Sequence, residues 1–267
     1  MPPRTFFALA GAGFRRWSTY RQATVAAAFT NTVFGFLRMY VLYAVAAGVG
    51  GVVAGYDLAM LASYVWFGQG LIGVVMLFAW TDLADRVRTG EITADLLRPV
   101  DPVWSYLASD LGRAGHAALF RLMLPVAMGA VWFDLSTPDR WLSYPLFGLS
   151  VLLAVVISFG VRYLVNLTAF WLLDVRGAMT LWLFGSTLLS GLVVPIRFFP
   201  EWTQWLLWLG TPFPAVVQAP LDVYVEYSDL SGQLLVLADQ AFWVVLALSL
   251  CRWVQYRAVL KLVIQGG

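Results

Sequence analysis

The feature that most limits the fold of this chain is the uninterrupted apolar run at residues 58–80. It contains 23 residues and no charged side chain. A helix needs about 20 apolar residues to cross the hydrocarbon core of a bilayer, and inside that core every backbone polar group needs an internal partner. The run therefore predicts a membrane-spanning α-helix. Gly70 and Gly73 within it would let a neighbouring helix approach closely.

The composition of the chain agrees with a membrane protein. Of its 267 residues, 61% are hydrophobic and only 12% are charged, whereas soluble domains have about 25% charged residues. The net charge of +2 gives no indication of a nucleic-acid partner. A single cysteine, Cys251, excludes an intramolecular disulfide. We expect an all-α integral membrane protein.

Six segments are long and apolar enough to be spans, although several contain an interruption. The expected spans are 25–47, 58–80, 115–133, 141–173, 178–196 and 232–252. The fourth exceeds the length of a simple crossing, so its helix is expected to tilt or to extend beyond the membrane. Ahead of the first span, residues 14–24 interleave arginines with aromatic side chains. This pattern suits either an interfacial amphipathic helix or a basic lead-in to the span.

Basic residues set the orientation of the six spans. With the N-terminus in the cytoplasm, only Arg140 and Arg197 fall outside. Basic residues favour the cytoplasmic side, so both termini are expected there. The basic residues placed inside are Arg4, Arg15, Arg16, Arg21, Arg86, Arg88, Arg98, Arg113, Arg176, Arg252, Arg257 and Lys261.

The outer segment 197–229 is apolar but interrupted. Residues 202–221 carry no charge and are as long as a span, yet they include Gly210 and three prolines, which break helices. Two short helices that enter the membrane and return would explain both properties, provided that protein or water covers their backbone. The tryptophans that recur every third residue here, Trp202, Trp205 and Trp208, fit an interface belt or the lining of a path for amphiphiles.

Three arginines lie within or near the expected spans. An arginine at the bilayer centre costs ~2.5–3.5 kcal/mol on insertion scales, so each needs an explanation. The three are Arg38, Arg121 and Arg162. They either line a polar path and bind an anionic group, or lie near the inner leaflet and extend toward its headgroups; the second interpretation is favoured for Arg121 and Arg162.

The chain has none of the patterns of an enzyme that hydrolyses nucleotides. It contains no Gly-x-x-x-x-Gly-Lys-Ser/Thr loop, no Gly-x-Ser-x-Gly elbow and no His-Glu-x-x-His helix. His116 is the single histidine, and no Cys, His or carboxylate cluster that would suit a metal accompanies it. We expect no catalytic, metal-binding or cofactor-binding residues in this chain.

The longest polar segment is the loop 81–114, which the orientation places in the cytoplasm. Within it, Gly90 and Pro99 bracket eight residues, enough for about two turns of helix. Ile92 and Leu96 are four residues apart and would share one face. A short helix with an apolar face and charged flanks would either dock in a groove of another protein or lie on the membrane surface.

The phrase from Arg88 to Pro99 in this loop, Arg-Thr-Gly-Glu-Ile-Thr-Ala-Asp-Leu-Leu-Arg-Pro, follows the second span. It resembles the Gly-x-Ile-x-x-x-Leu-Leu-Arg-Pro loop of a bacterial branch of type-2 ABC exporter permeases, and the six-span order with a broken segment before the last span is similar as well. The resemblance implies that a separate ATP-binding-cassette subunit binds this loop. The implied coupling helix comprises Gly90, Glu91, Ile92, Thr93, Asp95, Leu96, Leu97, Arg98 and Pro99.

The same resemblance implies the rest of the assembly. The whole chain would be one permease domain of a bacterial cytoplasmic membrane, paired with a second, identical or homologous permease around a path. Residues 14–24 would be a connecting helix, and 200–221 a re-entrant outer gate with Trp202, Trp205, Pro212, Phe213 and Pro214 as its candidate residues. ATP and Mg would be bound by the ATPase. Because the spans show no charge-rich cavity, a hydrophobic or amphipathic cargo is expected.

Two other functions remain open at this point. An intramembrane enzyme acting on lipids would need a polar catalytic set, which one histidine and few membrane-embedded carboxylates do not favour. A membrane scaffold that recruits a partner through 81–114 without transporting anything agrees equally well with the sequence.

Overall fold

A computed structural model describes residues 1–77, 80–172 and 174–261 of the chain. In these residues all regular elements are helices. The α-helices are α1 (Pro3–Ser18), α2 (Arg21–Gly48), α3 (Leu58–Val75), α4 (Asp82–Thr89), α5 (Ile92–Leu96), α6 (Pro102–Phe120), α7 (Met123–Trp132), α8 (Ser143–Leu167), α9 (Arg176–Leu189), α10 (Glu201–Gly210), α11 (Gln218–Tyr224) and α12 (Leu230–Val259). Two 3-10 helices, η1 (Thr168–Phe170) and η2 (Ile196–Phe198), follow α8 and α9.

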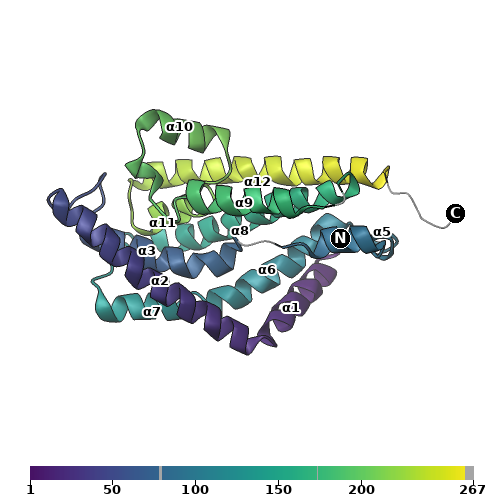
Figure 1. The fold of residues 1–267 in the computed structure, drawn as a ribbon, viewed down its shortest axis with the longest axis horizontal. Coiled ribbons are helices and arrows are strands. Elements are labelled where there is room, and N and C mark those ends of the chain that lie inside the picture. Colours follow the sequence, from purple (N-terminus) through teal and green to yellow (C-terminus); the bar gives the residue numbers. More distant parts are fainter. Residues whose placement is uncertain (78–79, 173, 262–267) are drawn as a thin grey trace.

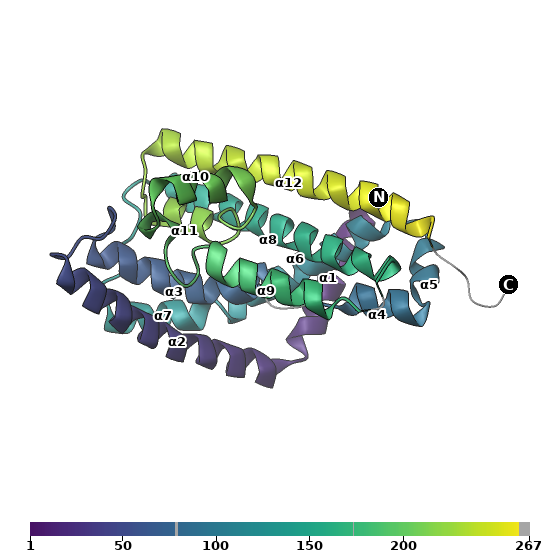
Figure 2. The same cartoon turned by 45° about the horizontal axis from the view of Figure 1, so that its top comes forward.

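The long helices run side by side along the long axis of the molecule (Figures 1 and 2). Helix α3 is the central one, since its side chains from Leu61 to Val75 are all buried. The N-terminus, α4, α5 and the last turns of α12 gather at one end, and α10, α11 and the α2–α3 connection lie at the other (Figures 1 and 2). Basic residues lie in the last turns of both α4 and α12 at the first of these ends.

Five helical segments in the described residues are long and apolar enough to cross a membrane: α2, α3, α6 with α7, α8 with η1, and α12. The all-α membrane class is thus confirmed. The expected fifth span, 178–196, is represented by α9, which has 14 residues and ends at Leu189. At 1.5 Å per residue, this helix is about 21 Å long, shorter than the hydrocarbon core.

Helix α3 ends at Val75, five residues before the end of the expected span 58–80. Met76 adopts a left-handed conformation (φ 53°), which terminates the helix. Side chains from other helices bind the carbonyls that this ending exposes: Arg113 donates to Gly73 and Val74, and Ser158 donates to Val75. The sequence did not indicate this helix end, because these partners come from distant parts of the chain. Residues 78–79 of the expected span lie outside the described residues.

The third crossing begins earlier than expected. Helix α6 starts at Pro102, with the Asp101 side chain accepting from the backbone N–H of Val103, so residues 102–114 belong to the helix and the expected start at 115 was wrong. The helix is interrupted at Arg121, whose carbonyl would face the ring of Pro125 if the helix continued. Helix α7 then carries the chain onward to Trp132.

The N-terminal helix also lies elsewhere than expected. It occupies Pro3–Ser18 and ends before Tyr20, rather than covering 14–24. It packs closely against α6, because a Cβ on Gly13 would lie 2.2 Å from the Ser109 carbonyl oxygen and a Cβ on Gly112 would lie 1.9 Å from that of Ala10. The two glycines permit a backbone-to-backbone contact that fixes α1 to the bundle.

The remaining spans differ from expectation at their ends. Helix α8 covers Ser143–Leu167, and its 25 residues are about 38 Å long, which is more than the hydrocarbon core requires. Helix α12 covers Leu230–Val259 instead of 232–252. Its 30 residues extend about 45 Å, so its last turns reach beyond the hydrocarbon core. Gly70 and Gly73 of α3 face the α6–α7 junction, where added Cβ atoms would approach Leu122 and Arg121 to 2.8 and 3.0 Å.

Candidate functional site

The segment expected to lie in the cytoplasm and to contact a partner contains α4 and α5, joined through Gly90. This glycine has a φ of 80°, a left-handed conformation that ends α4 and that other residues adopt at a cost. The helix expected between Gly90 and Pro99 is present, but it is only the five residues of α5. We call residues 90–99 the coupling segment.

The prediction that Ile92 and Leu96 form an exposed apolar face for docking to a partner is wrong. Ile92 is 2% exposed and packs with Leu83, Val103 and Leu107, while Leu96 is partly buried against the same cluster. Their i, i+4 spacing does give them a common face, but this face is turned toward the chain's own helices. Leu97 is the large apolar side chain of the segment that faces outward, with 86% of its surface exposed.

Asp95 holds the coupling segment to its neighbours. Its carboxylate accepts from Arg86 Nε at 2.7 Å and from the Tyr106 hydroxyl at 2.9 Å, and Arg98 lies 3.6 Å away. Arg86 also contacts Glu91 at 3.3 Å. Burial acts against the charged form of Arg86, but the hydrogen bond to Asp95 and the nearby charges of Asp95 and Glu91 together outweigh it, so the pKa of Arg86 is raised. The Asp95 carboxylate therefore binds partners within this chain, whereas the Glu91 and Arg98 side chains are largely exposed.

Beneath the coupling segment lies a buried charge cluster formed by Asp110, Arg113 and Arg162. Asp110 accepts from Arg113 Nε at 2.6 Å and from Arg162 Nη2 at 2.8 Å. Arg162 also lies 3.3 Å from Ser158 Oγ. The interpretation that Arg162 extends to the inner headgroups is wrong, because this side chain is fully buried and its charge is paired within the protein. The sequence analysis missed Asp110 as the partner of Arg162, because the expected span boundaries placed Asp110 in a loop.

A cavity of about 860 Å³ connects the coupling segment with the buried charge cluster. Its lining comes from α1, the start of α2, α4, the coupling segment, α6 and α8, and includes Arg16, Arg86, Asp95, Asp110 and Arg162. This end of the bundle therefore contains a polar cavity, which lowers the cost of holding five arginines there.

Arg38 and Arg121 do not join this cluster as ion pairs. Arg38 donates to the Val193 carbonyl oxygen at 3.3 Å, near the outer end of α9. Arg121 lies at the end of α6 beside Gly73 and is partly exposed. Within the described ranges, neither Nε finds an acceptor and neither side chain contacts a carboxylate.

His116 has a packing role. It is 5% exposed, with its ring 5.4 Å from that of Phe14 and 4.8 Å from that of Phe120. It therefore joins α1 to α6. Among the described residues there is no group of three His, Cys, Asp or Glu side chains placed to hold a metal ion.

The outer segment contains the two short helices expected from its breakers, α10 and α11. Every residue of α11 is buried, and Gln218 at its start binds four partners. Its amide donates to Tyr56 and Asp222 and accepts from the Tyr64 hydroxyl and the Ile196 N–H, at 2.6–2.8 Å. The irregular backbone is thus satisfied by protein, as buried backbone must be at membrane depth.

Sequence reasoning missed the amide side chains that support this segment. Gln240 of α12 donates to the Ala215 carbonyl oxygen at 2.8 Å, and Gln233 is buried beside Val223. Asn166 of α8 similarly joins Trp80 to the start of α4. The available signal was an uncharged polar residue inside an apolar span, and for Gln233 and Gln240 a spacing of seven, which places both on one helix face.

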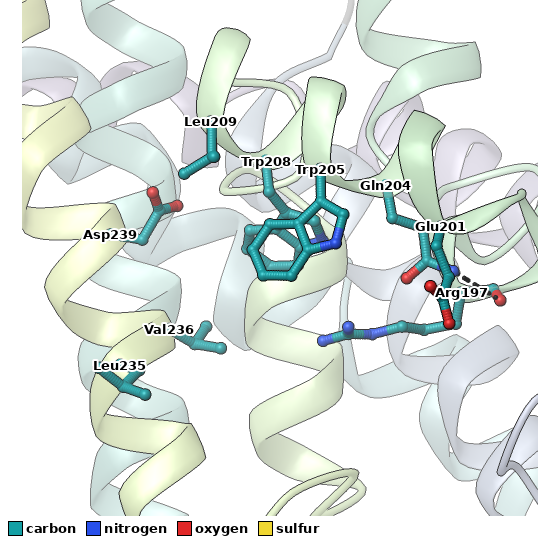
Figure 3. A pocket seen from close by; sticks show the side chains of 9 residues that line it. All are labelled: Arg197, Glu201, Gln204, Trp205, Trp208, Leu209, Leu235, Val236 and Asp239. Atoms are coloured by element: carbon teal, nitrogen blue, oxygen red, sulfur yellow. Dashed lines mark hydrogen bonds between the residues drawn. The ribbon is translucent and has the colours of Figure 1, made fainter.

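The candidate gate residues divide into two groups. Phe213 and Pro214 are packed inward, with Phe213 stacked 5.9 Å from Trp182 of α9. Trp202 and Trp205 of α10 are about 70% exposed. Trp205 and Trp208 line an outer pocket against α12, whereas Trp202 is not part of its lining (Figure 3). The three tryptophans therefore do not act as one face.

A family model described as "ABC-2 family transporter protein" matches residues 29–266, almost the whole chain. The chain belongs to the ABC-2 transporter family. No curated protein and no solved structure matches it. Family membership makes this chain a membrane component of an ABC transporter, associated with an ABC ATPase and not itself the catalytic subunit. The chain is accordingly a multi-pass membrane protein, in agreement with the five long apolar helical segments found in its described residues.

Proposed function

We propose that this ABC-2 chain is a permease of a bacterial exporter. It spans the cytoplasmic membrane with both termini inside, pairs with a second permease, identical or homologous, and is driven by an ATPase subunit that binds ATP and Mg and contacts the coupling segment. The observation that carries the proposal is an exposed apolar residue, Leu97, on a short segment that is otherwise anchored firmly to the bundle.

The anchoring supports a mechanical role for the coupling segment. Asp95 connects it to Tyr106 of α6, and buried Ile92 connects it to the hydrophobic cluster at the same end. Asn166 of α8 accepts from the Ala84 N–H of α4 at 3.0 Å and donates to the Trp80 carbonyl oxygen. A displacement applied at Leu97 would therefore reach α6 and α8 as rigid-body motion instead of bending a loose loop.

The packing of the bundle supports a path between two permeases. Helix α3, at the centre of the chain, is surrounded by side chains along nearly its full length. A path through the middle of one chain would require this core to open at the cost of many packed contacts. A path along the surface of the chain, closed by a second permease, requires no such opening. A cargo that crosses there would contact mainly apolar side chains, which suits a hydrophobic or amphipathic molecule.

The substitution Leu97→Asp tests the contact with the ATPase. The genomic partner ATPase is co-expressed, and its co-purification with the permease is measured. We expect Leu97→Asp to abolish co-purification, because a carboxylate would be desolvated in an apolar groove. Val52→Asp is the matched control, since Val52 is exposed in the outer α2–α3 connection. Undiminished ATPase binding by Leu97→Asp would refute the proposal.

Cysteine labelling tests the orientation. In a Cys251→Ser background, cysteines replace Ser228, beside the outer end of α12, and Thr89, at the end of α4. We expect a membrane-impermeant maleimide to label position 228 in intact cells and position 89 only after permeabilisation. The opposite pattern would overturn the orientation while leaving the membrane class intact.

A further inference from the structure

A pocket of about 590 Å³ lies between α10 and the first third of α12. Figure 3 shows that one wall carries Glu201, Trp205 and Trp208 from α10 and that the facing wall carries Leu235 and Asp239 from α12. Asp239 lies nine residues into α12, about 13 Å from the start of that helix. With the proposed orientation, the pocket opens at the level of the outer leaflet.

Asp239 is the unusual residue of this pocket. Its Oδ2 atom is buried and makes no hydrogen bond within the described residues. The indole N–H of Trp243, one turn further along α12, lies near this carboxylate but makes no hydrogen bond of normal geometry within the described residues. A buried carboxylate oxygen without a partner is costly, and a residue of this kind in a span indicates a ligand or a missing cation.

Arg197, the cationic side chain that lines the pocket, is already paired with a carboxylate. Arg197 binds Asp222 through two contacts of 3.1 and 3.2 Å and lies over the rings of Trp208 and Tyr227. It therefore does not neutralise Asp239. Because Glu201 makes no ion pair within the described ranges, the carboxylates of the pocket exceed its free cations.

The apolar surface of the pocket is exposed. Trp205, Leu209 and Leu235 are each about 70% exposed at its rim. The ring of Trp205 leaves a face open for a cation, whereas Trp208 already holds Arg197. A carboxylate with an aromatic face and aliphatic side chains matches a ligand that carries a positive centre inside an apolar shell.

We propose that this pocket binds a lipophilic organic cation, with its positive centre between Asp239 and Trp205 and its apolar groups against Leu209 and Leu235. The inference concerns binding alone. It does not depend on transport or on the ATPase, so it can fail while the proposed function holds, and the reverse is also true.

The test uses the purified full chain in maltoside micelles, without ATPase. Isothermal titration measures binding of tetraphenylphosphonium and of tetraphenylborate, which have nearly the same shape and opposite charge. We expect saturable binding of the cation only. In Asp239→Asn its affinity should fall by roughly tenfold or more, since a desolvated charge contact is lost. Asp139→Asn is the control, because it removes one exposed carboxylate on the outer side but outside the pocket.

A second variant protects the test against a folding defect. Trp205→Ala replaces an exposed side chain, so the fold should persist while affinity for the cation falls severalfold through loss of the aromatic face. Equal binding of both ions, or unchanged affinity in both Asp239→Asn and Trp205→Ala, would overturn the inference. Added phosphatidylcholine that displaces the probe would assign the site to a lipid ammonium headgroup, and failure to displace it would assign the site to a soluble cation.

Discussion

The buried charge cluster gives the sharpest prediction about the stability of this protein. Asp110→Asn removes the carboxylate shared by two arginines, and the two are left in different situations. Arg113 still donates to the carbonyl oxygens of Gly73 and Val74. Arg162 keeps Ser158 Oγ, a methionine sulfur and a contact with the Trp80 ring, none of which is an anion. The loss of the carboxylate should therefore destabilise the protein mainly by leaving Arg162, which is fully buried, without an anionic partner.

The magnitude follows from the geometry of the Arg162–Asp110 pair. At 2.8 Å and an effective dielectric constant of about 20, the attraction is ~6 kcal/mol, and desolvation of the two groups offsets a large part of it. Leaving one partner buried and unpaired costs about 3–5 kcal/mol. We expect Asp110→Asn to lower the free energy of unfolding by this amount. Arg162→Met should cost less, because Asp110 retains Arg113.

The double variant Asp110→Asn/Arg162→Met distinguishes this explanation from a general packing defect. It removes the orphaned cation, so it should be more stable than Asp110→Asn alone by roughly 1–3 kcal/mol. Denaturant and thermal unfolding in maltoside micelles, followed by tryptophan fluorescence, provide the measurement. The exposed pair Asp174–Arg176 is the control, and its removal should have no measurable effect. A double variant no more stable than Asp110→Asn would refute the reasoning.

Three further predictions concern other parts of the chain. Gly112→Ala should destabilise the contact of α1 with α6 by about 1–3 kcal/mol and expose α1 to trypsin, whereas Gly148→Ala, whose Cβ meets no atom within 4 Å, should not. Ile92→Asp should make the coupling segment sensitive to trypsin, while Leu97→Asp leaves it resistant; equal resistance would contradict the burial of Ile92. Burial acts against the charged form of Glu226, but hydrogen bonds from Ser143 and Arg140 lower its pKa below 4.5. Its contribution to stability is therefore present above pH 4.5 and lost as the pH falls through the lower folded value, and Glu226→Gln should flatten this acid limb of the unfolding profile.

The coupling segment shows how far a local pattern can be interpreted. Its sequence correctly indicated a short helix bounded by Gly90 before a proline, because these residues act on their own backbone. The i, i+4 spacing of Ile92 and Leu96 correctly gave one shared face. The direction of that face was wrong, since it depends on α6 and α8, which are distant in sequence.

The charged residues show the same division. Arg162 was visible as a charge in a span, but its partner Asp110 is 52 residues away and lay outside the expected third span. The amides of Gln218 and Gln240 were likewise visible, yet the backbone groups that they satisfy belong to a segment without a regular pattern. No rule of spacing connects such pairs, because only packing of the helices brings them together.

The sequence by itself determined that this is a membrane protein, its helical class and its family, since these follow from hydrophobic run length and one local motif. Its count of basic residues predicts the orientation. The tertiary structure decided where α3 and α6 end and begin, which residue of the coupling segment faces outward, and how each buried charge is paired. The physical reason is that backbone and charged groups inside a bilayer must find partners in the protein, and these partners are neighbours in space that can be far apart in the chain.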